Sequence, residues 1–523
     1  MGTVWKKSFI ALLTVGLVLL APLFTWAADR EIVILHTNDI HCGVNDNLGL
    51  FTVAKMKKDA LAKTPYVALV DAGDAVQGAP IGKLSKGEAV INMLNAAGYD
   101  FAIPGNHEFD YGMERFWQLN KKLKSGYYSA NFEDLRTKKL ALPAYKMMQF
   151  GDTKVAFVGA TTPGTLISST PAFFQDGKGN YLYGFNEDET GRKLYKALQK
   201  SINAARENGA DYVFLVGHLG LNGSIEYWNC ENVAANTRGV DAIIDGHSHE
   251  RIQGKHVKNY VGKDVLITQT GTKLKTVGQI VIGTDGKITS TLIKADGGDN
   301  AKVQKVISRE IAKYEPLLQQ PVGEALVQLR SNDPKTGERL VRNNECSLAN
   351  FVTDAFKNVL GCDVVLVNGG SIRNKIKQGV ITYNDLLEAF PFGNMCAVIE
   401  VSGQQILEAL EMGASHYPNE FGGFFQVAGL EYTINSKIPS TVQLDEKGNF
   451  SRVGGLYRVS DVRIGGQPLD INKKYTVGGT TYVLKDGEKS DVDAIMEYIQ
   501  KQLDGKIGEQ YNNPYGDGRI RIK

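Results

Sequence analysis

Histidine is scarce in this chain, with 8 in 523 residues, and most of it falls in short polar clusters. Imidazole nitrogens and carboxylate or amide oxygens are ligands that divalent transition metals accept. One carboxylate can bridge two such ions about 3.5 to 4 Å apart. Five of the eight histidines lie in the polar clusters, which are Asp39-Ile40-His41, Gly73-Asp74, Gly105-Asn106-His107-Glu108, Gly217-His218 and Gly246-His247-Ser248-His249.

Two metal ions held by these clusters would suit the hydrolysis of a phosphate ester. Such a pair lowers the pKa of a bound water, so that metal-bound hydroxide can attack phosphorus near neutral pH. Its positive charge also stabilises the phosphoryl oxygens during in-line displacement. A lone His or Asp after a strand is usually an ordinary loop residue, but the joint set predicts a metal centre. His36, His256 and His416 have no such companions, and we interpret them as structural.

Short apolar runs precede the clusters and predict the strands of an α/β layered domain. Ligand sites in open α/β sheets lie outside the carboxyl ends of the strands, so the clusters should meet at one rim. Gly73, Gly105 and Gly246 each precede a predicted ligand, where unusual backbone angles and close approach favour glycine. The runs cover residues 32–35, 66–70, 101–103, 155–159, 212–216 and 242–244, with a predicted helix at 189–208.

A charged, amphipathic segment at residues 300–318 predicts a helix that links two domains. Pro321 follows it, and a new strand-like run begins at residue 325. The remainder again mixes strands, as at 363–367 and 395–401, with helices, as at 404–412. We therefore expect domains at 28–298 and 320–523, separated by a linker at 299–319.

The first 27 residues have the pattern of a secretory signal peptide. Lys6 and Lys7 precede an apolar run, and Thr25-Trp26-Ala27 places small residues at the two positions that signal peptidase inspects. This pattern predicts export to the periplasm or the cell exterior, with no membrane attachment after cleavage. A retained membrane anchor is the alternative, because the run is nearly long enough to span a bilayer.

The cysteines and the net charge argue against several classes of protein. The 5 cysteines show no C-x-x-C spacing, which argues against a disulfide framework and a cysteine zinc site; one pair, such as Cys346 with Cys362, stays open. The chain has 59 basic and 57 acidic residues, and Lys6 and Lys7 belong to the predicted signal. A formally neutral mature chain argues against a nucleic acid polymer as partner.

The five clusters resemble the motif series of the calcineurin-like metallophosphoesterases, D-x-H, G-D, G-N-H-E/D, H and G-H-x-H, in that order. Thr37-Asn38-Asp39-Ile40-His41 and Gly105-Asn106-His107-Glu108-Phe109-Asp110 are similar to the versions in the secreted bacterial 5′-nucleotidase and UDP-sugar hydrolase family. The resemblance covers essentially the whole mature chain. It implies a four-layer α/β/β/α metallophosphoesterase domain, a linker helix and a C-terminal α+β nucleotide-binding domain.

The resemblance also implies roles for individual residues. One metal would be held by Asp39, His41 and His249, the other by Asn106, His218 and His247, and Asp74 would bridge them. His107 would stabilise charge on the phosphate, and Asp110 would orient His107. A structural histidine is the alternative for His107, and a helix N-cap is the alternative for Asp110.

The second half contains residues similar to the family's substrate-binding residues. Arg342 and the segment Asn368-Gly369-Gly370-Ser371-Ile372-Arg373 resemble the parts that hold phosphates and ribose. Phe392 would stack on the base and Asn394 would hydrogen-bond it, with core packing as the alternative for Phe392. Tyr482 would be the second stacking aromatic.

The sequence departs from the family pattern after Tyr482. The family usually has Phe or Tyr followed by G-G-D-G there, whereas this chain has Asp486-Gly487-Glu488. Either Glu488 or a displaced Asp486 would therefore bind the ribose hydroxyls. The base preference therefore stays open.

Together these features predict an exported phosphohydrolase that releases phosphate from nucleotides and uses two divalent ions, Zn, Mn, Co or Fe. The alternatives are a 2′,3′-cyclic-nucleotide phosphodiesterase, a UDP-sugar hydrolase, a related sulfur-oxidation hydrolase, and a surface protein that binds nucleotides without catalysis. The sequence does not indicate the oligomeric state.

Overall fold

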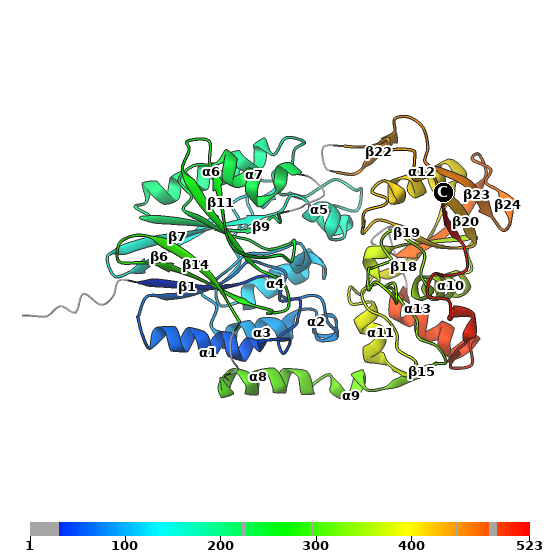
Figure 1. Ribbon diagram of the computed structural model, residues 1–523, viewed down its shortest axis with the longest axis horizontal. Helices are drawn as coiled ribbons and strands as arrows, with labels where there is room; N and C mark the ends of the chain where they lie inside the picture. Colours follow the sequence, from blue (N-terminus) through cyan, green and yellow to red (C-terminus); the bar gives the residue numbers. More distant parts are fainter. Residues whose placement is uncertain (1–30, 222–225, 295–297, 299, 446–447, 481–488) are drawn as a thin grey trace, which may run out of the picture.

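Two α/β halves lie side by side and are joined along one edge by helices (Figure 1). The computed structural model describes residues 31–221, 226–294, 298, 300–445, 448–480 and 489–523. The predicted signal peptide, Tyr482, Asp486 and Glu488 lie outside these residues. No helix in the described part is long and apolar enough to cross a bilayer.

The first half contains two sheets packed face to face. A five-stranded sheet has the order β14-β13-β1-β2-β3, and a six-stranded sheet has the order β11-β12-β10-β9-β7-β6. In the first, β1, β2 and β3 are parallel, as are β7, β9, β10 and β12 in the second. The strands are β1 (Ile32–Thr37), β2 (Val67–Asp71), β3 (Phe101–Ala102), β6 (Tyr145–Phe150), β7 (Thr153–Thr161), β9 (Tyr212–His218), β10 (Ala242–Ile244), β11 (Arg251–Lys258), β12 (Asp264–Thr270), β13 (Val277–Ile282) and β14 (Ile288–Ile293).

Helices cover the outer face of each sheet, which confirms the predicted four layers. Alternate side chains of β1 point to opposite faces: Ile34 packs between the sheets with Phe157 and Phe214, whereas Leu35 packs beneath the helices. α1 (Gly49–Leu61) and α3 (Glu88–Ala97) cover the first sheet, and α8 (Ala301–Ala312) packs against both of these helices. α6 (Arg192–Glu207) and α7 (Cys230–Asn236) cover the second sheet. Gly209, with φ +88°, lies just beyond the end of α6.

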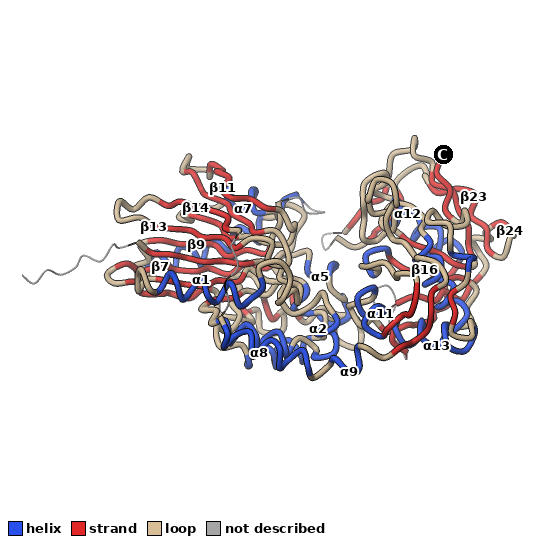
Figure 2. The backbone as a smooth tube through the Cα atoms, turned by 60° about the horizontal axis from the view of Figure 1, so that its bottom comes forward, coloured by secondary structure: helices blue, strands red, loops and turns tan. Residues whose placement is uncertain are grey.

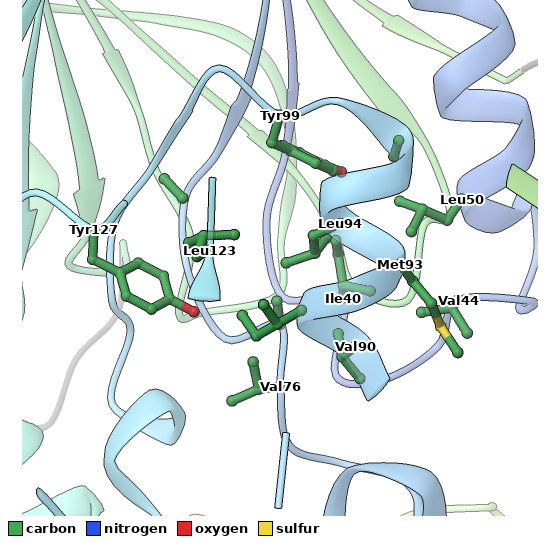
Figure 3. Close-up of a cluster of buried hydrophobic side chains, with 14 of the residues drawn as sticks. Ile40, Val44, Leu50, Val76, Val90, Met93, Leu94, Tyr99, Leu123 and Tyr127 are labelled. Atoms are coloured by element: carbon green, nitrogen blue, oxygen red, sulfur yellow. The ribbon is translucent and has the colours of Figure 1, made fainter. Parts of the chain in front are cut away.

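The core around α3 also anchors the loops that follow β1 and β2. Val90, Met93 and Leu94 of α3 lie in the same cluster as Ile40 and Val76 (Figure 3). Ile40 stands between Asp39 and His41, Val76 stands two residues after Asp74, and both are fully buried. Burying these apolar side chains holds the intervening polar residues at the sheet rim.

The connection between the halves differs from the single helix expected at 300–318. The segment forms α8 and a separate short helix, α9 (Glu315–Leu318), along the lower edge of the molecule (Figure 1). Pro316 explains the break, because proline lacks an N–H group and is tolerated only in the first turn of a helix. The strand expected at 325–329 is also displaced: β15 (Pro321–Ala325) ends where that run was to begin, and Leu329 makes only an isolated bridge to Ile376.

The second half is built on a five-stranded sheet with the order β19-β16-β25-β18-β26. Val365 and Val367 of β16 face α10 and α13, whereas Val364 and Leu366 face α12 and β20. Figure 2 shows this half as a distinct mixture of helices and strands. Its elements are α10 (Ser347–Leu360), β16 (Val364–Asn368), β17 (Gly379–Thr382), α11 (Tyr383–Ala389), β18 (Met395–Ser402), α12 (Gly403–Ala414), β19 (Phe425–Ala428), β20 (Leu430–Ile434), β21 (Val442–Leu444), β22 (Phe450–Val453), β23 (Val459–Ile464), β24 (Gln467–Pro468), β25 (Lys474–Thr480), β26 (Lys489–Ser490), α13 (Asp491–Glu497), β27 (Lys506–Ile507) and β28 (Ile520–Ile522).

The five cysteines and the three histidines set aside above lie in ordinary structural surroundings. All five cysteines are buried and free, so Cys346 and Cys362 are not paired. His36 is fully buried in β1, opposite Gly278 of β13, where any Cβ would lie 1.9 Å from the ring. His256 is exposed on β11, and His416 stacks on Phe421.

Candidate active site

The predicted metal ligands of the first half converge at one rim, where β9 ends and the loops after β1, β2, β3 and β10 meet. The loops after β1 and β2 are hydrogen-bonded to each other, because the backbone N–H groups of Asp39 and His41 donate to the carbonyls of Gly73 and Asp74, each at 2.9 Å. Potential ligand atoms lie within 4.8 Å of one another in three groups, which are Asp39-His41-His249, His41-Asp74-His107 and Asp74-His218-His247.

Asp74 belongs to two of these groups. Its Oδ2 is 3.0 Å from His218 Nε2 and 3.9 Å from His41 Nε2. In the Asp39 group, His249 Nε2 lies 3.3 Å from Asp39 Oδ1 and 3.0 Å from His41 Nε2. The position of Asp74 in two groups is the one that a carboxylate bridging two ions would need.

The backbone around these side chains has a less common conformation. Asp39, His41, Asp74, His247 and His249 have φ values of 50°, 47°, 59°, 80° and 58°. Positive φ costs energy in residues with a side chain and concentrates at functional sites. Five of the seven predicted ligands thus have these unusual angles.

The glycines before the ligands are needed chiefly for close loop packing. A Cβ at Gly105 would lie 2.2 Å from Asp74 Oδ1, and one at Gly246 would lie 2.9 Å from His218 Nδ1. Neither residue has positive φ. Gly73 meets both requirements, because its φ is +88° and a Cβ would lie 2.5 Å from the Gly105 nitrogen. The expected unusual angle is therefore found only at Gly73.

Hydrogen bonds from the other ring nitrogen orient two of the histidines. His41 Nδ1 donates to the carbonyl of Gln77 at 3.1 Å, and His218 Nδ1 donates to that of Ala72 at 2.7 Å. Both rings therefore direct Nε2 into the cluster, as metal-binding histidines do.

Burial and the neighbouring charges set the protonation of the cluster. Burial lowers the pKa of His41 to about 3 and that of His247 to about 4, so both imidazoles are neutral near pH 7. Burial also opposes charge on His218, but Asp74 and Asp39 raise its pKa to about 10. Desolvation would raise the pKa of Asp74, yet His218 and His107 hold it well below its usual value.

Divalent metals fit this arrangement. The donors are three carboxylate or amide oxygens and four imidazoles, which come from Asp39, Asp74, Asn106, His41, His218, His247 and His249. Asn106 is 2% exposed, and its Oδ1 has no hydrogen-bond partner among the described residues. A buried oxygen of this kind normally has a partner, and a bound cation would provide one.

Glu108 is a supporting residue to which the sequence analysis gave no role. It is 1% exposed, and its carboxylate accepts backbone N–H bonds from Gly105 at 2.7 Å and from Asp74 and Ala75 at 2.8 Å each. One side chain thereby fixes the two loops that carry Asp74 and Asn106. A glutamate next to the predicted His107 was the available signal.

Asp245 and Asn38 support the site in the same way and were also missed. Asp245 is fully buried and accepts the N–H groups of Leu219 and Gly220 at 2.9 and 3.0 Å, just beyond His218. Asn38 donates to Asp39 Oδ2 at 2.6 Å. Asn38 directly precedes the predicted ligand Asp39, and Asp245 lies two residues before the predicted ligand His247, so their positions could have indicated these roles.

His107 and Asp110 form a hydrogen-bonded pair at the edge of the cluster. His107 Nδ1 lies 2.6 Å from Asp110 Oδ2, and Asp110 Oδ1 accepts the hydroxyl of Ser169 at 2.8 Å. His107 Nε2 lies 4.0 Å from Asp74 Oδ2. Burial opposes protonation, but Asp110 and Asp74 together raise the pKa of His107 above its ordinary value. The ring is thus held where it can present a positive charge.

Both halves of the chain line the cavity in front of the cluster. Its volume is about 410 Å³. The first half contributes Asp74, Asn106, His107, Asp110, His247 and His249, and the second half contributes Arg342, Asn368, Arg373, Phe392 and Asn394. Every predicted substrate residue that the structure describes therefore lines the cavity of the predicted metal ligands. Tyr482 and Glu488 fall outside the described residues.

Phe392 of the second half lies over the ring of His107 in the first half. Its ring centroid is 5.6 Å from that of His107, at an interplanar angle of 28°, and the Arg373 guanidinium carbon lies 4.8 Å from the Phe392 centroid. Asn394 is 8% exposed, and its Nδ2 has no hydrogen-bond partner in the described structure. A buried amide on the cavity wall is suited to a polar ligand.

The loop after β16 is packed closely against its neighbours. A Cβ at Gly369 would lie 2.0 Å from the Val341 carbonyl oxygen, which precedes Arg342. The Gly370 N–H donates to the carbonyl of Gly422 at 2.8 Å. Close approach therefore explains the two glycines and fixes Asn368 and Arg342 relative to each other.

Comparison with protein families matches both halves. The family model described as calcineurin-like phosphoesterase matches residues 32–251, and that described as 5′-nucleotidase, C-terminal domain, matches residues 321–494.

Individual relatives are similar to this chain over most of its length. The snake venom 5′-nucleotidase of Gloydius brevicauda is 28% identical over 95% of this chain and 90% of its own length. The trifunctional nucleotide phosphoesterase protein YfkN of Bacillus subtilis is 28% identical over 78% of this chain, which spans only 29% of that longer protein.

A solved structure with a similar fold covers both halves. The crystal structure of the 5′-nucleotidase precursor from Thermus thermophilus superposes with a TM-score of 0.73 at 26% identity, covering 94% of this chain and 99% of that one. With both domain types present in order, and with a donor set suited to metals, the chain belongs to the metal-dependent 5′-nucleotidase family of phosphohydrolases.

Proposed function

We propose that this chain is an exported enzyme that hydrolyses nucleotides to nucleosides and phosphate at a centre of two divalent ions. Asp39, His41 and His249 would hold one ion, Asn106, His218 and His247 the other, and Asp74 would bridge them. Ions bound there would supply Lewis-acid stabilisation of the phosphate and a water of lowered pKa.

The side chains around the ions would bind and orient the substrate phosphate. His107 is held by Asp110 and raised in pKa, so it would donate to a phosphoryl oxygen as negative charge builds in the transition state. Arg342 and Arg373 line the same cavity and would bind phosphate oxygens through their guanidinium groups.

The base and ribose would be bound by the second half. Phe392 would stack on the base and Asn394 would hydrogen-bond it through its unpaired Nδ2. Since Phe392 packs over His107 in this conformation, base stacking would require the ring to leave that contact. Tyr482 and either Glu488 or Asp486 would complete the site.

The observation that carries the proposal is the shared cavity of about 410 Å³, which is lined by predicted metal ligands of the first half and by Arg342, Arg373 and Phe392 of the second half. Five of the predicted metal ligands have positive φ, a conformation that costs energy. A protein that only binds nucleotides would not need this strained backbone. The names of the relatives, a venom 5′-nucleotidase and a nucleotide phosphoesterase, favour the same substrate class.

A substrate panel tests the proposal directly. The purified chain is assayed with AMP, 2′,3′-cyclic AMP and UDP-glucose, with Mn²⁺ and with EDTA, and its metal content is measured alongside. We expect AMP hydrolysis that EDTA abolishes and Mn²⁺ restores. Turnover that persists in EDTA would contradict the metal centre. A strong preference for cyclic AMP or UDP-glucose would replace the nucleotidase with the corresponding diesterase or sugar-nucleotide hydrolase.

The proposed export has its own test, because the first 30 residues lie outside the described structure. Mass spectrometry of the protein secreted from its natural host should show a chain that begins at Ala28. An intact N-terminus in the membrane fraction would favour the retained anchor instead.

A further inference from the structure

A second cavity, of about 460 Å³, adjoins the one in front of the metal cluster. The two cavities share Ser168, His247, Asn368 and Gly422 as wall residues. The rest of its wall is largely apolar and includes Leu219, Trp228, Met412, Phe421, Phe425 and Phe450. We call it the aromatic chamber. Arg342, Arg373 and Phe392 line only the first cavity, so the two spaces differ sharply in chemistry.

Two of the aromatic walls are held in place by contacts outside the chamber. The Phe421 ring stacks on His416 with a centroid distance of 4.2 Å and an interplanar angle of 15°. Trp228 is 3% exposed, and its Nε1 donates to the carbonyl of Asp188 at 3.0 Å. Walls fixed before binding lose little conformational entropy when a ligand enters.

The chamber wall is also hydrogen-bonded to the loops that carry Arg342 and Asn368. The Phe421 N–H donates to the carbonyl of Arg342 at 3.0 Å, and the Gly369 N–H donates to that of Phe424 at 2.7 Å. Asn368 and His247 face both cavities. A phosphate bound at the metal cluster would therefore sit where the two cavities join, with room for one substituent on each side.

The lining of the chamber restricts its occupant. The described residues of this wall include no Lys, Arg, Asp or Glu, which argues against a second phosphate or any other ion. Flat aromatic walls favour a flat aromatic or heterocyclic group, and each stacked ring contributes a measurable share of affinity. A phosphate monoester has one organic group on phosphorus and could fill only one cavity, whereas a diester has two.

We propose that the aromatic chamber binds the second organic group of a nucleotide diester, when that group is aromatic or heterocyclic. The inference rests on the proposed function and extends it to substrates with two organic groups on one phosphorus. In the reaction a water oxygen forms a bond to phosphorus, and the bond from phosphorus to the second ester oxygen breaks. That oxygen keeps the bonding electron pair and leaves with the chamber group, while the nucleoside 5′-phosphate and the proton of water are released.

Thymidine 5′-(4-nitrophenyl) phosphate and thymidine 5′-phosphate make a matched pair of probes, because only the diester carries a second ring. Binding is measured by calorimetry in EDTA, and kcat/KM is measured with Mn²⁺. We expect Phe421→Ala to weaken binding of the diester about tenfold. The ratio of its kcat/KM to that of the monoester should fall by a similar factor. Phe173→Ala, at a half-buried ring that lines neither cavity, is the control and should leave the ratio unchanged.

An equal loss for both probes, or no loss for either, would overturn the proposal. If Phe421→Ala does not fold by circular dichroism, Phe450→Ala on β22 makes the same comparison from another wall. The wild-type assay with thymidine 5′-phosphate separates the two ideas. If that monoester is not hydrolysed while diester binding in EDTA still depends on Phe421, the proposed nucleotidase function fails and the chamber stands.

Discussion

The two halves of this molecule build their parts of the cavity in different ways. In the first half, Asp39, Asp74 and His218 are at most 2% exposed, and buried groups such as Glu108 hold the backbone around them. In the second half, Arg373 is exposed, and Arg342 and Phe392 are half-buried on loops. The part proposed to bind metal is thus fixed from several directions, whereas the part proposed to bind substrate is fixed mainly through its backbone.

This difference suits the chemistry expected of each half. A metal centre requires its donors at set distances, so it is supported by a second layer of hydrogen bonds. Side chains on loops can change without disturbing a fold, and substrate selection commonly resides there. Changes in the first half should therefore reduce activity toward every substrate, whereas changes in the second should alter the preference among substrates.

His218→Ala should have the largest effect. The ring is fully buried at the end of β9 and lies 3.0 Å from the acid proposed to bridge the two ions. We expect kcat to fall below about one-thousandth of wild type for all substrates. Elemental analysis should show less bound metal. His256→Ala, at an exposed histidine of the same sheet, should match wild type; full metal content in His218→Ala would contradict the ligand assignment.

His107→Ala should have the second-largest effect, and it should lower kcat without lowering the metal content. Loss of a contact made to the transition state lowers kcat by a factor on the order of 10² to 10³ while KM changes little. Metal content should stay at the wild-type level, since His107 is not among the proposed ligands. Steady-state kinetics and metal analysis on one preparation check both points. An unchanged kcat would remove His107 from the mechanism.

Glu108→Gln should weaken the metal site without removing a ligand. The carboxylate accepts N–H bonds from both ligand loops, and an amide can accept at only one of its two positions. We expect metal affinity to fall about 10- to 100-fold, as is typical when supporting groups are changed. Titration of the metal-free protein measures this, with Glu114→Gln on the exposed face of α4 (Met113–Lys122) as control. Equal affinities would show that the loops hold their shape unaided.

Much of the first half could be predicted from the sequence, because its signals are local. Each polar cluster follows a short β-branched run, and the ends of parallel strands meet at one rim, so His41, Asp74 and His218 could be placed together without coordinates. The supporting roles of Glu108 and Asp245 could not be assigned in this way. Each stands within two residues of a predicted ligand, which indicates a place in the site, but their partners are backbone N–H groups of other loops, and no residue type marks the positions of those partners.

The second half was less predictable for a physical reason. The motif around Asn368 and Phe392 indicated substrate binding, but their position facing His107 depends on how two separately folded halves pack. The aromatic chamber needs Trp228 from one half and Phe421 from the other, more than 190 positions apart. Local errors had local causes: Pro316 divides the predicted linker helix, and β15 begins earlier than its apolar pattern suggested.

The smallest effect is expected at the contact between the two halves. Lys83 of α2 (Pro80–Ser85) lies 3.1 Å from Asp491 at the start of α13 and donates to the carbonyl of Phe390 at 3.2 Å. The two side chains are 13% and 3% exposed. Burial raises the pKa of Asp491, and Asp493 adds to this, while Lys83 opposes it. Removing Lys83 would leave a buried carboxylate without its countercharge.

Lys83→Met should therefore destabilise the protein in a pH-dependent way. Above the pKa of Asp491 the uncompensated charge should cost about 2 kcal/mol of unfolding free energy. Because the folded state holds this proton more tightly than the unfolded state, the deficit should shrink as the pH falls and Asp491 becomes neutral. Thermal unfolding at pH 8 and pH 5 measures the difference. Lys83→Met combined with Asp491→Asn should recover most of the loss, and Lys55→Met, at an exposed lysine, should show none. A deficit equal at both pH values would mean that Lys83 stabilises the contact through packing alone.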